Sequence, residues 1–560
     1  MAEKAAEEIF KDFKSHSVAE FFKKNKQMLG LYGKIRSLTT IVHETTTNSL
    51  DACEEAKILP KIDVKLVEIG EEYYELTSTD NGPGIPKDTI GKALGQLLAG
   101  TKFHRLVQTR GQQGIGVSGV ILFSQLTTGK PVRIISGTKK GKPISMEITI
   151  DTKKNEAKIA NEKELSTQFQ GLAIKAQFKD ILFRKSEQSP EEYLRRTAIA
   201  NPHAEISFLN PFGEKITFRR TSKEIPEAPI EVQPHPKGIT VDEINTMSKY
   251  TMAKKTSSFL KQDFDRIGDK AIKELNKLVD FDLNKDPKKL SWSDCEQIVK
   301  GFKRISFIAP RLDALRPIGM ERIDKSLKSI VKPEFVSVVT RKPSVYSGGF
   351  PFQVEVAIAY GGDAGRTSSS GSDTINGEES SGRRGEIMRF ANRAPLMFDG
   401  GACAITKAIN SVEWKRYGVK NFDNAPLTVF VNLLSVHIPY TSAGKTAISD
   451  DEEILEELRL ALMDAGRKIS GFINLKKKIA DKTEKKKIFL KYIPEIAESL
   501  SKITSEKQKD LEKKLTAMVM EKLRLEEMQE KAESKKAKGD EQALIEETSD
   551  QEEESDEDDD

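Results

Sequence analysis

The stretch HETTTNSLDAC, residues 43–53, places a carboxylate and a carboxamide at helical spacing. On a helix, Glu44 and Asn48 lie four residues apart on one face, with Asp51 beside them. A carboxylate can take a proton from water, and an amide oxygen can bind a hard cation such as Mg²⁺. A zinc-protease HExxH motif is excluded, because Thr47 stands where the second histidine is required. The pattern is common by itself, so its meaning depends on the rest of the chain.

A second motif, DNGPG, begins at the end of the strand-like stretch YYELTSTD, residues 73–80. Asp80 offers an acceptor for an exocyclic amine, and Gly82 and Gly84 permit a turn with close backbone approach. An ordinary Asp-Asn-Gly turn explains the same residues. The motif therefore indicates a binding loop only in combination with others.

A third motif, GQQGIGVSG at residues 111–119, precedes the apolar stretch VILFSQL. A glycine-rich loop ahead of a helix presents free backbone N–H groups to a phosphate. Far downstream, SAGKT at residues 442–446 resembles a P-loop, but Pro439 stands where a P-loop requires glycine. What remains there is Lys445 on a loop between a predicted strand and a predicted helix.

Strand patterns dominate the first part of the chain and helical patterns the next. Few helices separate the strand-like stretches before residue 225, which predicts one mixed sheet covered by helices on one face. Four prolines within residues 225–237 indicate a linker, and residues 241–315 have a helical pattern. Before the first strand, Val18, Phe21 and Phe22 suggest an anchoring face on a short helix. The strand-like stretches are 62–69, 73–80, 132–138, 144–151, 172–178, 204–210 and 215–221.

Strand patterns return at residues 352–360 and 427–436, and a helical stretch at 401–417 predicts a βαβ-type crossover into the second of them. The Gly/Ser-rich residues 361–385 are typical of a flexible surface loop. The spacing S-x-x-E at Ser449–Glu452 predicts a capping box that opens a long helix.

Beyond that helix the sequence becomes strongly charged. Residues 476–491 hold eight lysines against two acids, which predicts either a solvated face or a contact with a polyanion. A further helix after Pro494 is expected to carry an apolar stripe that docks on a partner protein. The stripe comprises Ile496, Leu500, Ile503, Leu511, Leu515 and Met518.

Composition and charge exclude several classes of protein. Hydrophobic residues make up 37% and charged residues 31%, which predicts a soluble chain with several cores rather than global disorder. The last 15 residues hold 11 acids and no base, so the other 545 carry a net charge of +15. A basic body suggests a polyanionic partner, and an acidic run is typical of a solvated tail. Three scattered cysteines exclude a disulfide framework, and no apolar run is long enough to span a membrane.

The order of the motifs, ExxxN on a helix, DxGxG after a strand and GxxGxG before a helix, resembles the GHKL ATPase family of gyrases, heat-shock chaperone ATPases, mismatch-repair ATPases and histidine kinases. Longer segments resemble one branch, the B subunits of type IIB (topoisomerase VI) DNA topoisomerases. These segments are SVAEFFKKNKQMLG, NSLDACEEAKILPKI, GTKFHRLVQTRGQQGIGVSGVILFSQLTTGKP, RFANRAPLMFDGGACAITKAI and VHIPYTSAGKTAIS.

The resemblance implies an α+β multidomain fold built from consecutive parts. In chain order these are an N-terminal strap (residues 1–30), a GHKL (Bergerat) α/β sandwich ATPase domain (31–228), a small helix-two-turns-helix domain (229–317), a transducer domain with a βαβ crossover (318–478), a charged helical region that follows the long helix (479–540) and a disordered acidic tail (541–560).

The resemblance also implies residue roles. Glu44 would be the general base, Asn48 would ligate Mg²⁺ and the phosphates of ATP, Asp80 would receive the adenine amino group, and Lys445 would reach the γ-phosphate. Thr47 stands where the family usually has Asp, and Leu172 stands where many relatives place a threonine near the adenine. The remaining cofactor-binding positions would be Gly82, Gly84, Thr101, Lys102, Gly111, Gln112, Gln113, Gly114, Ile115, Gly116, Val117 and Ser118.

The implied function is that of the ATP-binding and ATP-hydrolysing subunit of a type II (IIB) DNA topoisomerase in the cytoplasm, associated with the nucleoid. Two such B subunits would dimerise on ATP and join two DNA-cleaving A subunits in a heterotetramer that passes double-stranded DNA, relaxing positive and negative supercoils and decatenating. A chaperone or mismatch-repair clamp shares the ATP fold, but the helical insert and the basic stretch argue against it. A histidine kinase conflicts with His43, which adjoins the ATP-site glutamate.

Overall fold

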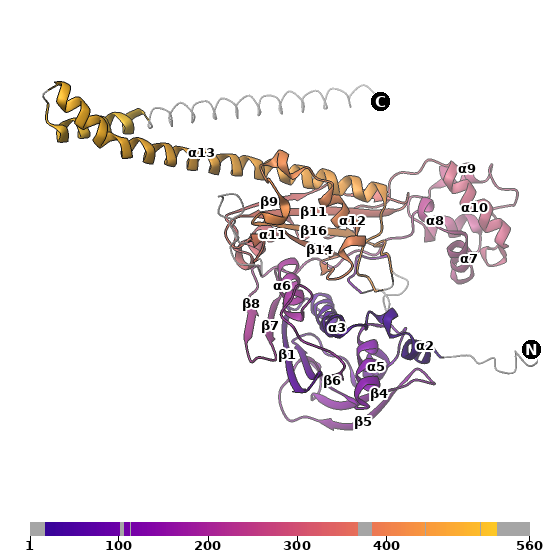
Figure 1. Cartoon of the computed structure of the whole chain (residues 1–560). Coiled ribbons are helices and arrows are strands. Elements are labelled where there is room, and N and C mark those ends of the chain that lie inside the picture. The colour runs from indigo at the N-terminus through magenta and orange to yellow at the C-terminus, as the bar shows by residue number, and fades with distance from the viewer. Residues whose placement is uncertain are drawn as a thin grey trace, which may run out of the picture. The chain divides into compact units, whose positions relative to one another are not determined.

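The computed structural model describes residues 17–100, 106–111, 114–367, 383–442, 444–504 and 506–522 (Figure 1). The chain separates into two units, one ending at Ser470 and one beginning at Gly471. Within the described ranges, no helix is both long and apolar enough to cross a bilayer. The predicted acidic tail, residues 541–560, lies outside these ranges, as do residues 1–16 of the predicted strap and most of the Gly/Ser-rich loop.

An eight-stranded sheet organises the first part of the chain in the order β5-β4-β3-β6-β2-β1-β7-β8. Its neighbours pair antiparallel except β1 and β7, so the sheet is mixed as predicted. Burial alternates along β2, which places one face against a core. The strands are β1 Lys61–Gly70, β2 Tyr73–Asp80, β3 Val132–Gly137, β4 Ile144–Asp151, β5 Glu156–Glu164, β6 Gly171–Lys179, β7 Glu205–Leu209 and β8 Lys215–Phe218.

Four helices cover that face, and Figure 1 shows α3 and α5 side by side over the sheet. They are α3 Lys34–Glu55, α4 Lys87–Gly95, α5 Gly116–Thr128 and α6 Pro190–Ala200. Ahead of them, α2 (Val18–Lys24) begins at an N-cap, Ser17, and leads into the 3-10 turn η1 (Lys26–Leu29). Val18 and Phe22 of α2 pack on the core, but Phe21 is 43% exposed, so the predicted anchoring face is wrong in that residue.

A small helical region follows the proline-rich segment, as predicted. Its core contains Phe259, Phe264 and Phe302, whose rings meet edge to face. Thr240 with Glu243 and Ser291 with Asp294 form capping boxes at two of its helices. The elements are η2 Pro236–Gly238, α7 Val241–Tyr250, α8 Thr256–Asp263, α9 Asp269–Leu275, η3 Pro287–Lys289 and α10 Trp292–Arg304.

A second sheet, with the order β10-β11-β16-β14-β15 and with β9 on β11, follows α11 (Met320–Ile330). The predicted crossover is present, because β14 and β16 pair in parallel. The helix within it, α12, spans only Ala404–Asn410, and the predicted stretch 401–417 is otherwise 3-10 turns and loop. The strands are β9 Phe335–Thr340, β10 Ser344–Tyr346, β11 Phe350–Tyr360, β14 Glu386–Ala391, β15 Ala394–Pro395 and β16 Leu427–Ser435; β12 Arg366–Thr367 and β13 Arg383–Arg384 form a separate pair.

The long helix α13 spans Glu452–Thr504 and differs from the prediction in two ways. The helix begins at Glu452 and its first backbone hydrogen bond runs from Leu455 N to the Asp451 carbonyl oxygen, so Ser449 is not the N-cap and the predicted capping box is wrong. The Ser449 hydroxyl instead donates to the carbonyl oxygen of Pro439 at 2.8 Å. The helix also continues through Pro494, and a separate helix covers residues 508–522. The predicted apolar stripe is therefore divided between two helices, with Leu511 buried and with Ile503 79% exposed.

Glu355 on β11 is a buried acceptor for the segment that leads into α11. Its carboxylate is fully buried and accepts hydrogen bonds from the backbone N–H of Ile318 (3.1 Å) and Gly319 (2.8 Å) and from the Asn432 side chain (2.9 Å). Burial raises the pKa of Glu355. Because these two N–H groups belong to Gly319, the N-cap of α11, and to the residue before it, Glu355 fixes the chain where it enters the helix.

We expect Glu355→Gln to lower the free energy of unfolding by about 1–3 kcal/mol, because an amide nitrogen would replace one buried acceptor. Equilibrium urea unfolding followed by circular dichroism measures this change. Glu321→Gln is the control, since Glu321 makes an exposed pair with Lys325 within α11, which contributes little. Equal stability of the two variants would contradict a stabilising role of the buried Glu355 carboxylate.

Candidate nucleotide-binding site

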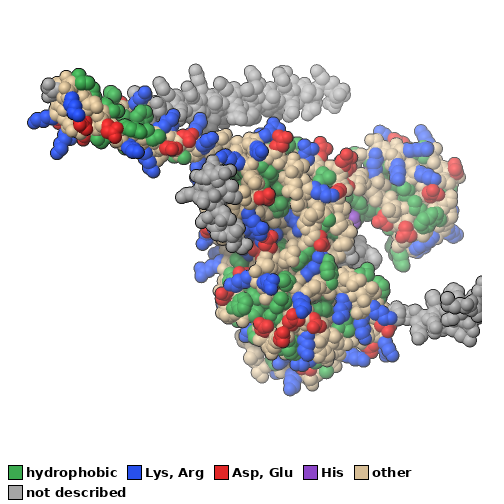
Figure 2. Space-filling view, viewed as in Figure 1, with side chains coloured by type: hydrophobic (Ala, Val, Ile, Leu, Met, Phe, Trp, Pro, Cys, Tyr) green, Lys and Arg blue, Asp and Glu red, His purple; other side chains and the backbone are tan. Residues whose placement is uncertain are grey.

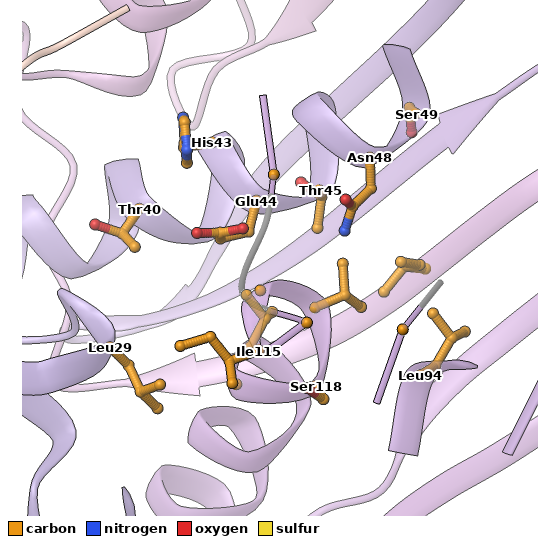
Figure 3. Close-up of a pocket in the computed structure, with 18 of the residues that line it drawn as sticks. Leu29, Thr40, His43, Glu44, Thr45, Asn48, Ser49, Leu94, Ile115 and Ser118 are labelled. Carbon is orange, nitrogen blue, oxygen red and sulfur yellow. The ribbon is translucent and has the colours of Figure 1, made fainter. Parts of the chain in front are cut away.

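A cavity of about 340 Å³ lies between α3, β2, the start of α5 and the loop at residues 444–446. That volume lies in the range of small-molecule sites. Figure 3 shows residues of α3, among them Glu44, Thr45 and Asn48, on one side of this space, with Ile115 and Ser118 on the other. Residues more than 300 positions apart in the chain therefore line one pocket.

Glu44 and Asn48 line the cavity from one face of α3, as their spacing predicts. Gly116, the first residue of α5, faces Glu44 so closely that a Cβ there would lie 2.1 Å from the carboxylate oxygen Oε2. Ile115 precedes α5 without a side-chain cap, so the first N–H groups of α5 remain available to an acceptor in the cavity. The carboxylate thus faces a helix N-terminus that can hold an anion.

Asp80 is held rigidly at the end of β2. Its carboxylate accepts hydrogen bonds from Ser49 Oγ (2.7 Å), Gly82 N (2.9 Å) and Leu172 N (3.1 Å). These bonds occupy about three of the four lone-pair positions of a carboxylate, which leaves room for one further donor. Burial raises the pKa of Asp80, although all three hydrogen bonds act in the opposite direction. Such a group can select a ligand that carries an N–H.

The turn after Asp80 requires glycine for steric reasons. Gly84 has φ of +70°, and a Cβ at this position would lie 2.3 Å from the carbonyl oxygen of Gly137. Gly84 itself lines the cavity, whereas Gly82 contributes only its N–H to Asp80. The close approach of two backbones therefore shapes the wall next to Asp80.

Lys445 enters the cavity from the loop that follows β16, and Gly444 and Thr446 line it as well. Lys445 has φ of +52°, a left-handed conformation that is uncommon for a lysine. Burial lowers the pKa of Lys445, and the carboxylates of Glu44 and Asp51 act in the opposite direction. The structure thus brings Lys445 to the same pocket as Glu44.

Other predicted positions fall into three groups. Gly111, Gly114, Ile115, Gly116, Val117 and Ser118 line the cavity. Thr101, Lys102, Gln112 and Gln113 lie outside the described residues. Asp51 is not part of the lining and instead pairs with Arg110.

Thr47, which stands where the family usually has Asp, does not line the cavity. Its hydroxyl lies 3.3 Å from the hydroxyl of Tyr193, whose ring also packs edge to face on His43. His43 is half-buried, and burial lowers its pKa. Both side chains therefore belong to the contact between α3 and α6.

Sequence reasoning missed a buried charge cluster that lies outside the cavity lining. Arg110 contacts Asp51 and Glu54 at 2.5 Å each, and Arg393 contacts Glu54 at 2.9 Å. His203 lies 2.9 Å from the same Glu54 carboxylate. These residues come from four distant parts of the chain, so no local spacing could have revealed the cluster.

Comparison with known proteins gives the same assignment along most of the chain. Residues 33–153 match the family described as histidine kinase-, DNA gyrase B- and HSP90-like ATPase, and residues 310–487 match the transducer of the topoisomerase VI B subunit. The B subunit of type 2 DNA topoisomerase 6 from Pyrococcus horikoshii is 44% identical, with 94% of this chain and 98% of the relative covered. Its counterpart from Methanothermobacter thermautotrophicus is 46% identical, with 91% and 96% covered. The chain belongs to the family of type 2 DNA topoisomerase 6 B subunits, and it is an ATP-hydrolysing enzyme of the type II topoisomerase class.

Proposed function

We propose that this chain uses ATP to dimerise and thereby to gate the passage of one DNA duplex through another. It acts with a DNA-cleaving A subunit in a heterotetramer of two A and two B subunits, which relaxes supercoils of both signs and decatenates DNA. The observation that carries the proposal is the shared cavity, in which Glu44, Asn48 and Asp80 meet a lysine from a different part of the chain, Lys445.

The lining of the cavity fits a nucleoside triphosphate. Asp80 has one acceptor position free for the adenine amino group, and the N-terminus of α5 with the glycines at 111–116 suits the phosphates. Lys445 would add a positive charge beside the terminal phosphate. Glu44 would take the proton of the attacking water. Thr101, Lys102, Gln112 and Gln113 are proposed to complete the lid.

Mg²⁺ is proposed to bind through Asn48. Among the residues that the structure describes, no group of three or more His, Cys, Asp or Glu is arranged to hold a metal. Mg²⁺ commonly takes only one or two protein ligands together with phosphate oxygens and water, so a single exposed amide fits that chemistry. The ion, when bound, would neutralise charge on the phosphates.

The proposed division of labour follows the predicted domains. The ATPase domain, residues 31–228, would bind the nucleotide, and the transducer, residues 318–478, would carry Lys445. The strap, residues 1–30, would exchange between two copies when ATP orders the lid. Triphosphate can drive this step only if the dimer binds it more tightly than the monomer does.

The basic part of α13 is proposed to lie near the DNA. Figure 2 shows basic, acidic and hydrophobic side chains interspersed along this helix. Lys485, Lys486 and Lys487 lie on α13 directly before the half-exposed Ile488 and Phe489. The region after Pro494 is proposed to dock on the DNA-cleaving partner, since Ile496 and Ile503 leave apolar surface exposed.

Glu44→Gln should lower the rate of ATP hydrolysis by about 10²–10⁴, because the variant cannot accept a proton from water. Binding of a non-hydrolysable ATP analogue should stay close to wild type, and isothermal titration calorimetry of the same preparation provides that control. A turnover rate close to that of the wild type would exclude Glu44 as the base.

Lys445→Ala should lower hydrolysis by about 10²–10³, because a charge aimed at the transferred phosphoryl group is lost. Lys407→Ala is the matched control, since Lys407 belongs to the same predicted domain and makes an exposed pair with Asp450 outside the cavity. A steady-state ATPase assay compares the two variants. If they had equal activity, Lys445 would have no role in the reaction.

Replacing Lys485, Lys486 and Lys487 by alanine should flatten the dependence of log K on log salt by up to about three, since each lost phosphate contact removes about 0.9 from the slope. Fluorescence anisotropy with duplex DNA at several salt concentrations measures it. Alanines at Lys507, Lys509 and Lys513 remove equal charge from the same unit and serve as control. An unchanged slope in the first variant would contradict the proposed contact.

A further inference from the structure

The loop that carries Lys445 is tied to the beginning of α3 through one aspartate. The Thr446 hydroxyl donates to Asp399 Oδ2 at 2.5 Å. Arg36, near the start of α3, donates to both oxygens of Asp399, at 3.1 Å to Oδ1 and 2.9 Å to Oδ2. The connection joins residues 363 positions apart, and α3 is also the helix of Glu44 and Asn48. A polar chain therefore links the lysine loop to the helix of the proposed general base.

Arg36 is itself fixed from two sides. Its guanidinium lies 4.2 Å from the ring centre of Tyr32 and 4.6 Å from that of Phe398. Its side chain is only 14% exposed, so the ion pair is better defined than a typical surface pair. The fork geometry of a guanidinium on a carboxylate also sets the orientation of Asp399. The Arg36 hydrogen bond lowers the pKa of Asp399, so the aspartate remains charged at neutral pH.

The backbone on both sides of this contact is in an uncommon conformation. Asp399 has φ of +54° and Lys445 has φ of +52°. A residue other than glycine keeps such a conformation only where surrounding contacts hold it. The hydrogen bond from Thr446 to Asp399 is one such contact next to Lys445, and Asp399 is itself outside the cavity lining.

We infer that Asp399 is a positioning residue, which with Arg36 holds the Thr446 hydroxyl and so directs the Lys445 ammonium to the terminal phosphate of the bound triphosphate. The inference rests on the proposed function of Lys445. It assigns to Asp399 and Arg36 a role in distinguishing triphosphate from diphosphate, although neither residue lines the cavity.

Two substitutions separate this role from general stability. Asp399→Asn removes the charge that binds Arg36, and asparagine tolerates the left-handed backbone at this position. Thr446→Val removes the hydroxyl with little change of shape, and Thr446→Ser restores it. Glu187→Gln is the matched control, because Glu187 pairs with Arg366 at 2.9 Å, an ion pair that also joins the two predicted domains and makes no contact with the lysine loop.

The experiment measures the dissociation constants of a non-hydrolysable ATP analogue and of ADP, and the rate of ATP hydrolysis, for the full chain in wild-type and Lys445→Ala backgrounds. We expect Asp399→Asn and Thr446→Val to lower hydrolysis about ten- to a hundredfold in the wild-type background, because a small displacement of a reacting group has effects of this size. They should raise the dissociation constant of the analogue about tenfold and leave that of ADP unchanged. Thr446→Ser should recover most of the activity that Thr446→Val loses, because it restores the hydroxyl, and Glu187→Gln should behave as wild type.

In the Lys445→Ala background, the same two substitutions should have no further effect, since the group that they position is absent. The inference is overturned if they lower hydrolysis there by the same factor as in the wild type, or if they weaken the binding of ADP and of the analogue equally. It is also overturned if they leave wild-type activity unchanged while Lys445→Ala is impaired. Full activity of Lys445→Ala itself would instead refute the proposed function of the lysine.

Discussion

Burying the ammonium of Lys445 beside Glu44 is the constraint on which the proposed nucleotide site depends. Removal from water lowers the pKa of Lys445, and the nearby carboxylates of Glu44 and Asp51 offset part of that cost. The lysine comes from the loop after β16, whereas both carboxylates belong to α3. The pocket is complete only while these two parts of the chain keep their relative position, because a displaced lysine leaves it without its positive charge.

Buried ion pairs help to fix the position of α6 and α3 relative to the second sheet. Glu386 of β14 is 2% exposed and contacts Arg195 of α6 at 2.6 Å, together with Arg196 and Arg366. Burial alone would raise the pKa of Glu386, but the three arginines, Arg195 foremost, lower it to about 2. A second buried cluster surrounds Glu54. Buried ion pairs contribute little net stability compared with apolar packing, but an incorrect alignment would leave charges unpaired. These ion pairs therefore favour one arrangement of the two parts over others rather than adding to overall stability.

The local sequence pattern was sufficient to predict helices and strands that bury one face. β2 alternates strictly, and Glu44 and Asn48 share a helix face as their spacing requires. β5 was missed because almost all of its residues are exposed, so that it has no hydrophobic period. Only the family resemblance predicted that Lys445 reaches this site. The pairing of Arg36 with Asp399 is seen in the structure alone, because these two residues are distant in sequence. Ser449 shows the converse, because a tertiary acceptor, the Pro439 carbonyl, takes the hydroxyl that local spacing assigns to a helix cap.

Hydrogen exchange of the backbone amides at residues 440–448, which include Lys445, tests most directly whether this loop completes the nucleotide site. The full chain is compared with saturating ADP and with a saturating non-hydrolysable ATP analogue, both with Mg²⁺. We expect slower exchange of this segment with the analogue than with ADP, because only the triphosphate offers the terminal phosphate that Lys445 would contact. Equal exchange in the two complexes would contradict a lysine loop that senses the triphosphate.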